Sequence, residues 1–155
     1  MGIFSTIKTA TGGTAKTYVP SGYKGLVTIA RCKLVTSKKP GDTSQYFVME
    51  GNYETVETGD VEVGGAATVM FRINPDPYGY GMADTRAALA AACGVSESDI
   101  DPDAAQAACG VDGDGTPIPG DGGTLLAGNS LHVQGIGQIA KSGSAYTKFQ
   151  FTAAQ

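Results

Sequence analysis

The sequence contains no tryptophan, one histidine and three cysteines, and no apolar run approaches the roughly 18 residues of a membrane helix. Cys32, Cys93 and Cys109 lack the spacing of a metal-binding motif, and only His132 could add an imidazole ligand. The first residues also lack the basic start and apolar stretch of a signal peptide. We therefore expect unpaired thiols in a reducing compartment, the cytoplasm, and no contact with a membrane.

The patterns that accompany catalysis and ion binding are incomplete or absent. Residues 112–115, DGDG, begin like a calcium loop, but the later oxygen ligand and the closing glutamate are missing. No glycine-rich stretch joins a strand to a helix as phosphate-binding loops do. His132 alternates with Leu131 and Val133 and has no triad partner, which is typical of a surface or packed histidine. We therefore expect a binding protein with no metal and no cofactor, and not an enzyme.

Positive charge is scarce in the middle of the chain. The net charge is −4, and residues 73–130 carry one arginine against nine acidic residues, a local charge of −8. Residues 1–72 and 131–155 each carry a net charge of +2. Any basic surface must therefore form where the two ends of the chain fold together.

The composition, with 23 glycines, seven tyrosines and five phenylalanines, favours strands and turns over long helices. Residues 1–21 have no sustained apolar period, so we expect an arm that precedes a single domain at 22–155. Alternation and β-branched residues predict five strands. Their ranges are 25–36, 44–55, 66–73, 129–140 and 145–152.

The first predicted strand has two distinct faces. Simple alternation places Leu26, Thr28, Ala30, Cys32 and Leu34 on one face. It places Val27, Ile29, Arg31, Lys33 and Val35 on the other. We therefore expect a long, bent strand that is shared by two parts of a sheet.

An acidic insert at 84–128 separates the third and fourth strands. Asp84 is a candidate N-cap for a helix that ends at the C-terminal cap Gly94. A second short helix is predicted between Asp101 and Gly110, and a glycine- and proline-rich surface loop follows it. The order of elements is then three strands, a helical insert and two strands. This order is that of a five-stranded OB-like Greek-key barrel, although a β-sandwich with a helical insertion fits the periodicity too.

Three local patterns carry a resemblance to a known family. They are Gly22-Tyr23-Lys24-Gly25 before an alternating strand, the hairpin KLVTSKKPGDTSQYFVMEGNYETVE and the closing segment LLAGNSLHVQGIGQIAKSGSAYTKFQF. Together they resemble small phage-encoded single-stranded DNA-binding proteins. The resemblance implies an OB-fold and an oligomer that coats single-stranded DNA during phage replication or recombination in the host cytoplasm. Many such proteins end in an acidic tail that recruits partners. Here the acidic segment 96–121 takes that place as the candidate contact for replication or recombination proteins.

Binding of single strands requires cations for the phosphates and flat side chains on which bases stack, at about 1–3 kcal/mol per base. Basic and aromatic residues alternate on the first and last strands and occupy the hairpin turns beside them. The predicted nucleic-acid-binding residues are Arg31, Lys33, Lys38, Lys39, Tyr46, Arg72, Lys141, Tyr146 and Lys148. They would converge if the first, second and last strands bounded one groove. The alternative is that the lysines keep the strands soluble and that Tyr146 half-buries at the rim.

Three further interpretations remain open at this stage. Tyr78 and Tyr80 could stack on bases or anchor their loop, and anchoring is favoured slightly. The chain could instead be a phage structural or assembly protein without nucleic-acid binding, since its acidic balance suits that role. A third reading is an inhibitor that captures a host protein through residues 96–121.

Overall fold

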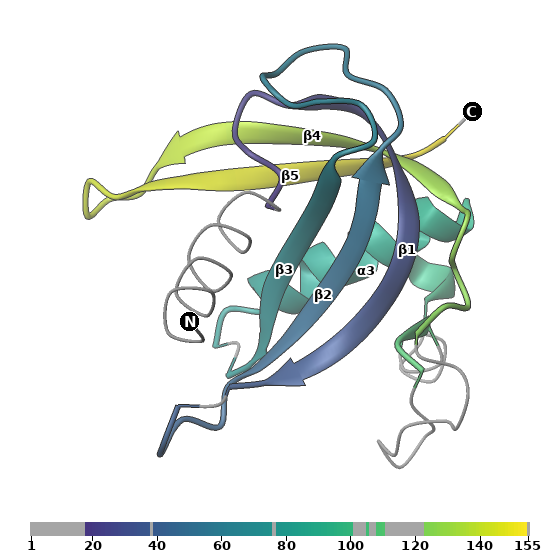
Figure 1. The fold of residues 1–155 in the computed structure, drawn as a ribbon. Helices are drawn as coiled ribbons and strands as arrows, with labels where there is room; N and C mark the ends of the chain where they lie inside the picture. Colours follow the sequence, from purple (N-terminus) through teal and green to yellow (C-terminus); the bar gives the residue numbers. More distant parts are fainter. Residues whose placement is uncertain are drawn as a thin grey trace, which may run out of the picture.

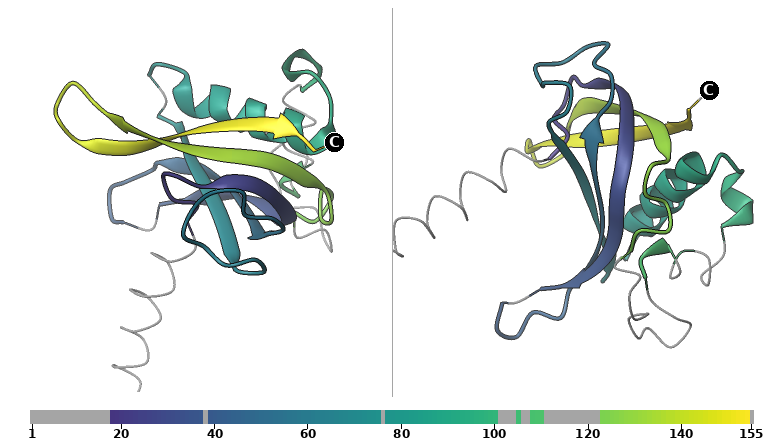
Figure 2. Two further views of the ribbon diagram at one scale, coloured as in Figure 1. Left: turned by 90° about the horizontal axis from the view of Figure 1, so that it is seen from above. Right: turned by 45° about the vertical axis from the view of Figure 1, so that its right-hand side comes forward.

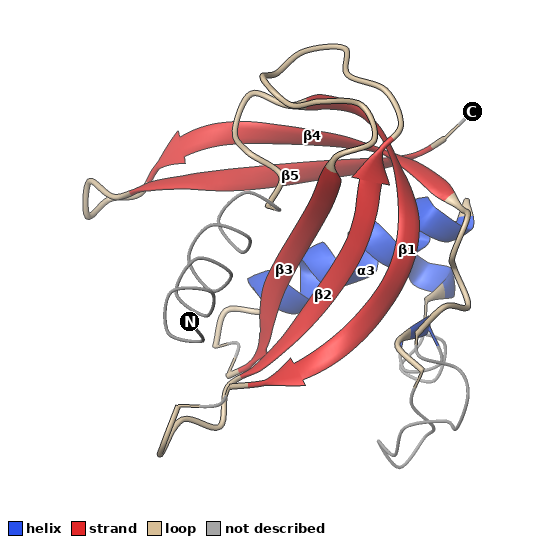
Figure 3. Cartoon of the chain, viewed as in Figure 1, coloured by secondary structure: helices blue, strands red, loops and turns tan. Residues whose placement is uncertain are grey.

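The structure, a computed structural model, describes residues 18–37, 39–75, 77–100, 105, 108–110 and 123–154. Five strands and the helix α3 have their bounds within these residues (Figures 1 and 3). They are β1 (Lys24–Thr36), β2 (Gln45–Tyr53), β3 (Ala66–Asn74), α3 (Tyr80–Cys93), β4 (Ser130–Ile139) and β5 (Ala145–Ala153), with a short 3-10 helix η2 (Glu97–Asp99) after α3. The predicted mainly β chain with a helical insertion after the third strand is confirmed. Every predicted strand end lies within two residues of the observed one.

The five strands form one antiparallel sheet in the order β3-β2-β1-β4-β5. β3 and β5 are its two edges, so backbone pairing does not close the sheet into a barrel. The edges nevertheless meet through side chains. The ring of Phe71 on β3 lies edge-on to Phe149 at 6.0 Å and to Phe151 at 5.9 Å, both on β5. Such aromatic pairs stabilise a contact beyond the area that they bury.

The sheet bends so that the β4–β5 hairpin crosses the end of the β1–β2–β3 part, and α3 covers the inner face behind it (Figures 1 and 2). α3 contacts β5, β3 and β4. Its buried side chains are mostly alanines, whose small size lets the helix approach the sheet closely. The largest fully buried side chains in this core are Tyr23, Ile29, Cys32, Phe47, Leu89 and Leu131.

The two predicted faces of β1 are wrong beyond its first half. The pairing of β1 with β2 shifts by one residue between Ile29 and Arg31, a β-bulge that turns the following side chains to the opposite face. Ile29 and Cys32 therefore share the buried face, although simple alternation separates them. Arg31 and Lys33, both beyond the bulge, stay together on the outer face.

The start of α3 differs from the prediction. Its N-cap is Gly79, with a left-handed φ of 75°, and not Asp84, which lies within the helix. Gly81 explains the earlier start, because a Cβ there would overlap the carbonyl oxygen of Arg72 on β3. Glycine thus lets the first helical turn pack directly on the strand. The predicted C-terminal cap at Gly94 is confirmed, with φ 70° and backbone hydrogen bonds back into the helix.

Several predicted features fall wholly or largely outside the described residues. These are Lys38, residues 1–17 of the arm, most of the second helix at 101–110 and most of the acidic segment 96–121. The described end of the arm lies along β3, where the backbone N–H of Val19 donates to the carbonyl of Thr68 at 3.0 Å. None of the helices in the described ranges is long and apolar enough to span a membrane.

Candidate nucleic-acid interface

Four predicted site residues share the outer face of β1, β2 and β3. Antiparallel register places Tyr46 opposite Arg72, and the same row continues to Val35 on β1. Two rows further on, Arg31 lies opposite Glu50. Directly paired residues of neighbouring strands point to the same side of a sheet. The structure therefore brings Arg31, Lys33, Tyr46 and Arg72 together on one surface, which we call the outer face.

Glu50 partly neutralises the cations of the outer face. Its Oε1 lies 2.8 Å from Arg31 Nε and 2.9 Å from Lys33 Nζ. Partial burial of the carboxyl opposes ionisation, but the hydrogen bonds and charges of Lys33 and Arg31 outweigh it and lower the pKa of Glu50. Glu50 is therefore ionised at neutral pH, and together with Arg31, Lys33 and Arg72 it gives a net charge of +2.

Arg72 differs from the other two cations of this face. It is exposed, and within the described residues it forms no ion pair or side-chain hydrogen bond. Its guanidinium is thus available to a phosphate without breaking an existing contact.

Two hairpin turns project beyond the outer face. The turn at 37–44 carries Lys39, and the turn at 140–144 carries Lys141, both exposed. Both turns extend to the same side of the β1–β2–β3 part, the side opposite α3 (Figure 2). The first turn is held by Asp42, whose Oδ1 accepts hydrogen bonds from Ser44 Oγ at 2.6 Å and Ser44 N at 2.9 Å. Both turns therefore present lysines beside the outer face.

Tyr146 and Lys148 form a separate group on the β4–β5 hairpin. They lie opposite Gln138 and Ile136 of β4, on the face away from the inward-packed Phe149. Among the described residues, no hydrogen bond or ion pair connects them to the outer face of β1–β3. The predicted single groove is thus two groups of residues, linked only by the placement of the hairpin turns.

The structure exposes two tyrosines that sequence reasoning favoured as anchors. Tyr78 and Tyr80 are 79% and 71% exposed, and their rings stack with centroids 5.8 Å apart. Anchoring is therefore wrong. The neighbouring glycines, Gly79 and Gly81, were the available signal, because residues without side chains leave the adjacent rings uncovered.

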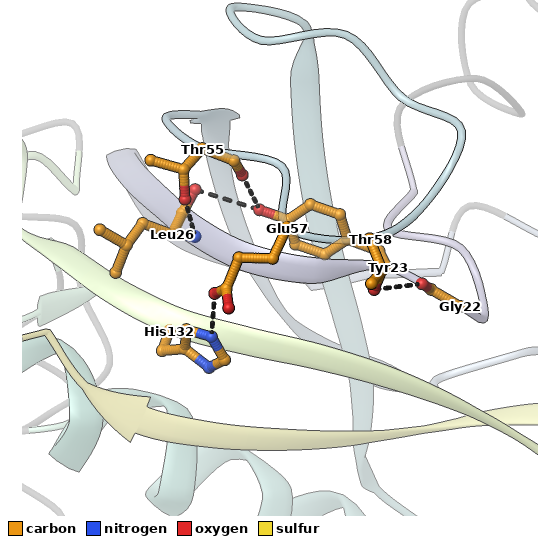
Figure 4. A network of polar contacts seen from close by, with 7 residues as sticks. All are labelled: Gly22, Tyr23, Leu26, Thr55, Glu57, Thr58 and His132. Atoms are coloured by element: carbon orange, nitrogen blue, oxygen red, sulfur yellow. Dashed lines mark hydrogen bonds and ion pairs between the residues drawn. The ribbon is translucent and has the colours of Figure 1, made fainter.

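A polar network joins the start of β1 and His132 on β4 to the loop after β2 and fixes that loop (Figure 4). The Tyr23 hydroxyl donates to the carbonyls of Thr55 at 2.7 Å and Leu26 at 3.1 Å. Burial, with nearby Tyr53 and glutamate charge, raises the pKa of Tyr23 to about 12. His132 Nε2 lies 2.7 Å from Glu57 Oε2. The Tyr23 hydroxyl and His132 hold the loop against β1 and β4, so the role of both side chains is structural.

The cysteines are unpaired, with Cys32 and Cys109 buried and Cys93 exposed. Burial raises the pKa values of Cys32 and Cys109 to about 12, so both remain neutral thiols at physiological pH. In the described part of the chain, no group of three or more potential metal ligands comes together.

Comparison with known proteins identifies no family for this chain. No protein-family model matches it, and no curated protein matches its sequence. Its own residues and their geometry must therefore support any function.

Proposed function

We propose that this chain binds single-stranded DNA without sequence preference on the outer face of β1–β3. The observation that carries the proposal is the placement of Arg31, Lys33, Tyr46 and Arg72 on one face, beside two lysine-bearing turns that project to the same side. Phosphate neutralisation and base stacking need such cations and aromatic rings together. In this proposal the chain coats single strands as an oligomer during phage replication or recombination in the host cytoplasm.

We further propose that the open sheet is an OB-like Greek-key barrel. Its order β3-β2-β1-β4-β5 leaves β3 and β5 as the two edges, and the ring of Phe71 on β3 contacts Phe149 and Phe151 on β5. α3 lies between β3 and β4 in sequence, as the helix of an OB-fold does. OB-folds bind oligonucleotides on the face of strands 2 and 3 and at the loops between strands 1–2 and 4–5. Those loops correspond here to the turns at 37–44 and 140–144.

Separation of charge supports binding by a chain of net negative charge. The acidic residues Glu97 and Asp99 belong to η2, which contacts α3. α3 lies on the opposite side of the β1–β2–β3 part from the two turns (Figure 2). The sheet therefore stands between this acidic segment and the proposed path of the phosphates, and it limits their repulsion.

A pair of arginine variants tests the proposal. The affinity for a fluorescent dT oligonucleotide is measured over a range of salt for the wild type, Arg72→Gln and Arg86→Gln. Arg86 is an exposed arginine on α3 and controls for the change in net charge. Loss of one phosphate contact should make the slope of log affinity against log salt shallower by about 0.7, and only in Arg72→Gln. Wild-type binding that ignores salt, or equal effects of the two variants, contradicts the proposal.

A second candidate function is a phage assembly protein. Ile139 and Tyr146, at the end of the β4–β5 hairpin, are 76% and 50% exposed, and β5 is an edge strand. Exposed apolar side chains beside an unpaired strand edge favour association between chains. Light scattering with and without dT distinguishes the functions. A defined oligomer without DNA, together with no DNA binding, favours assembly, whereas DNA-dependent growth favours coating.

A further inference from the structure

Tyr78 and Tyr80 form an exposed aromatic surface, because packing within the fold covers only a small part of either side chain. Their side chains are 79% and 71% exposed, yet their rings stack on each other at 5.8 Å with an interplanar angle of 28°. Burying a large apolar side chain is favourable, so two adjacent rings in water are the informative exception. Their near-parallel planes present a flat aromatic face to solvent.

The two tyrosines are held in place beside β3. Gly81 lets the start of α3 pack against the carbonyl of Arg72, and Thr85 Oγ1 donates to the Gly81 carbonyl at 2.8 Å. Tyr80 is therefore the first residue of a helix that is packed on the sheet, and the ring of Tyr78 stacks on it. Little conformational entropy would be lost if a ligand bound to them.

A pocket of about 290 Å³ lies between the tyrosines and β3. Its lining residues are Met70, Phe71, Arg72, Pro77, Tyr78, Tyr80 and Gly81. Arg72 lies opposite Tyr46 on β2, so the pocket continues the outer face beyond the edge of the sheet. Among the described residues, the lining combines aromatic rings and one cation, and it includes no carboxylate.

We propose that Tyr78 and Tyr80 bind an unpaired nucleobase of single-stranded DNA by stacking, while Arg72 contacts an adjoining phosphate. This proposal rests on the proposed function, and it adds a base-stacking subsite at the edge of the outer face. Every base has a flat π-face, so stacking of this kind tolerates any sequence. The arginine supplies the charge complementarity that an apolar partner would not need. A proline-rich peptide, which also docks on aromatic surfaces, is the competing occupant.

The experiment compares oligonucleotides with and without bases. The double variant Tyr78→Ala/Tyr80→Ala should bind dT at least about fivefold more weakly than the wild type, since the loss of one stacked base has about this effect. It should bind an abasic oligonucleotide of equal length as tightly as the wild type does. Tyr78→Phe/Tyr80→Phe, which keeps the rings, should retain wild-type affinity for dT. Leu125→Ala, a truncation of another exposed apolar residue at 63% exposure, should leave both affinities unchanged.

Each outcome separates the subsite from the proposed function. If the wild type binds dT in a salt-dependent manner and the double alanine variant binds it equally well, the subsite is wrong and the proposed function stands. Equal weakening on dT and on the abasic strand also overturns stacking. If the wild type does not bind dT at low salt, both proposals fail, and capture of a polyproline peptide that depends on the two rings would identify the competing occupant. Unchanged melting temperatures, expected for such exposed positions, show that the variants are folded.

Discussion

Replacing Glu50 by glutamine should strengthen binding of single-stranded DNA. In the folded chain the Glu50 carboxylate lies 2.8 Å from Arg31 Nε and 2.9 Å from Lys33 Nζ, on the face where we propose that DNA binds. A phosphate that contacts either cation must compete with this carboxylate. Glutamine keeps the size of the side chain and removes its charge, so both cations become fully available to phosphates.

The size of the gain follows from the charge of the outer face. Arg31, Lys33, Arg72 and Glu50 together carry a net charge of +2, and the substitution raises this charge by one unit. One additional phosphate neutralised on a single strand steepens the salt slope by about 0.7, which is about fivefold in affinity for each tenfold decrease in salt. The cost to the fold should be less than about 1 kcal/mol, because partly exposed ion pairs contribute little to stability.

The assay is fluorescence anisotropy of labelled dT at several salt concentrations, with Glu54→Gln as the matched control. Glu54 accepts hydrogen bonds from Thr28 Oγ1 at 2.7 Å and Ser130 Oγ at 2.9 Å, and it pairs with no cation in the described part of the chain. Its neutralisation raises the net charge equally without releasing Arg31 or Lys33. If Glu50→Gln binds no more tightly than the wild type, or if Glu54→Gln gives the same gain, the reasoning is refuted.

The same carboxylate predicts a pH dependence. Its pKa is lowered from the ordinary value of 4.5, so the ion pairs stabilise the fold above that value. They are lost as the pH falls through the lowered pKa, and protonation then releases both cations. The difference in dT affinity between the wild type and Glu50→Gln should therefore be constant near neutral pH and disappear only as the pH falls through the lowered pKa of Glu50. Persistence of the full difference well below the lowered pKa would show that the carboxylate is not its source.

Two further predictions concern the fold. Gly81→Ala should destabilise the chain by about 1–3 kcal/mol in chemical denaturation, although alanine ordinarily stabilises a helix, because its Cβ would overlap the carbonyl of Arg72; an increase in stability would rule out the close contact. In a thiol-reagent titration at mildly alkaline pH, the exposed Cys93 should react first, while Cys32 and Cys109, buried with pKa values of about 12, should react only on unfolding. Rapid reaction of all three thiols would contradict the described burial.

The strands were predictable because their periodicity is written in consecutive residues. All five lie within two residues of their expected ends, since alternating apolar and polar side chains are what a half-buried strand requires. Alternation could not predict which side chains of β1 point to the core beyond Ile29, because the bulge between Ile29 and Arg31 depends on pairing with β2. The helix start at Gly79 was missed for a similar reason. Glycine is a poor helix former, and only the contact of Gly81 with β3 explains its presence in the first turn.

The candidate site was predictable in residue type and only partly in arrangement. The alternation of cations on β1 identified Arg31 and Lys33, but their pairing with Glu50 depends on a strand register that the sequence does not state. The exposure of Tyr78 and Tyr80 depends on how the helix start packs against β3, which is a tertiary feature. Long-range register and packing, rather than local propensity, therefore determine which charges and rings are available to a ligand.

Mapping of backbone amide chemical shifts during titration with dT tests the proposed binding surface most directly. We expect the largest changes at Arg31, Lys33, Tyr46 and Arg72 and in the turns at 37–44 and 140–144, with η2 unaffected, and we expect them to reverse at high salt. Shifts confined to α3 and η2, or no shifts at low salt, would contradict binding of single-stranded DNA on the outer face of β1–β3.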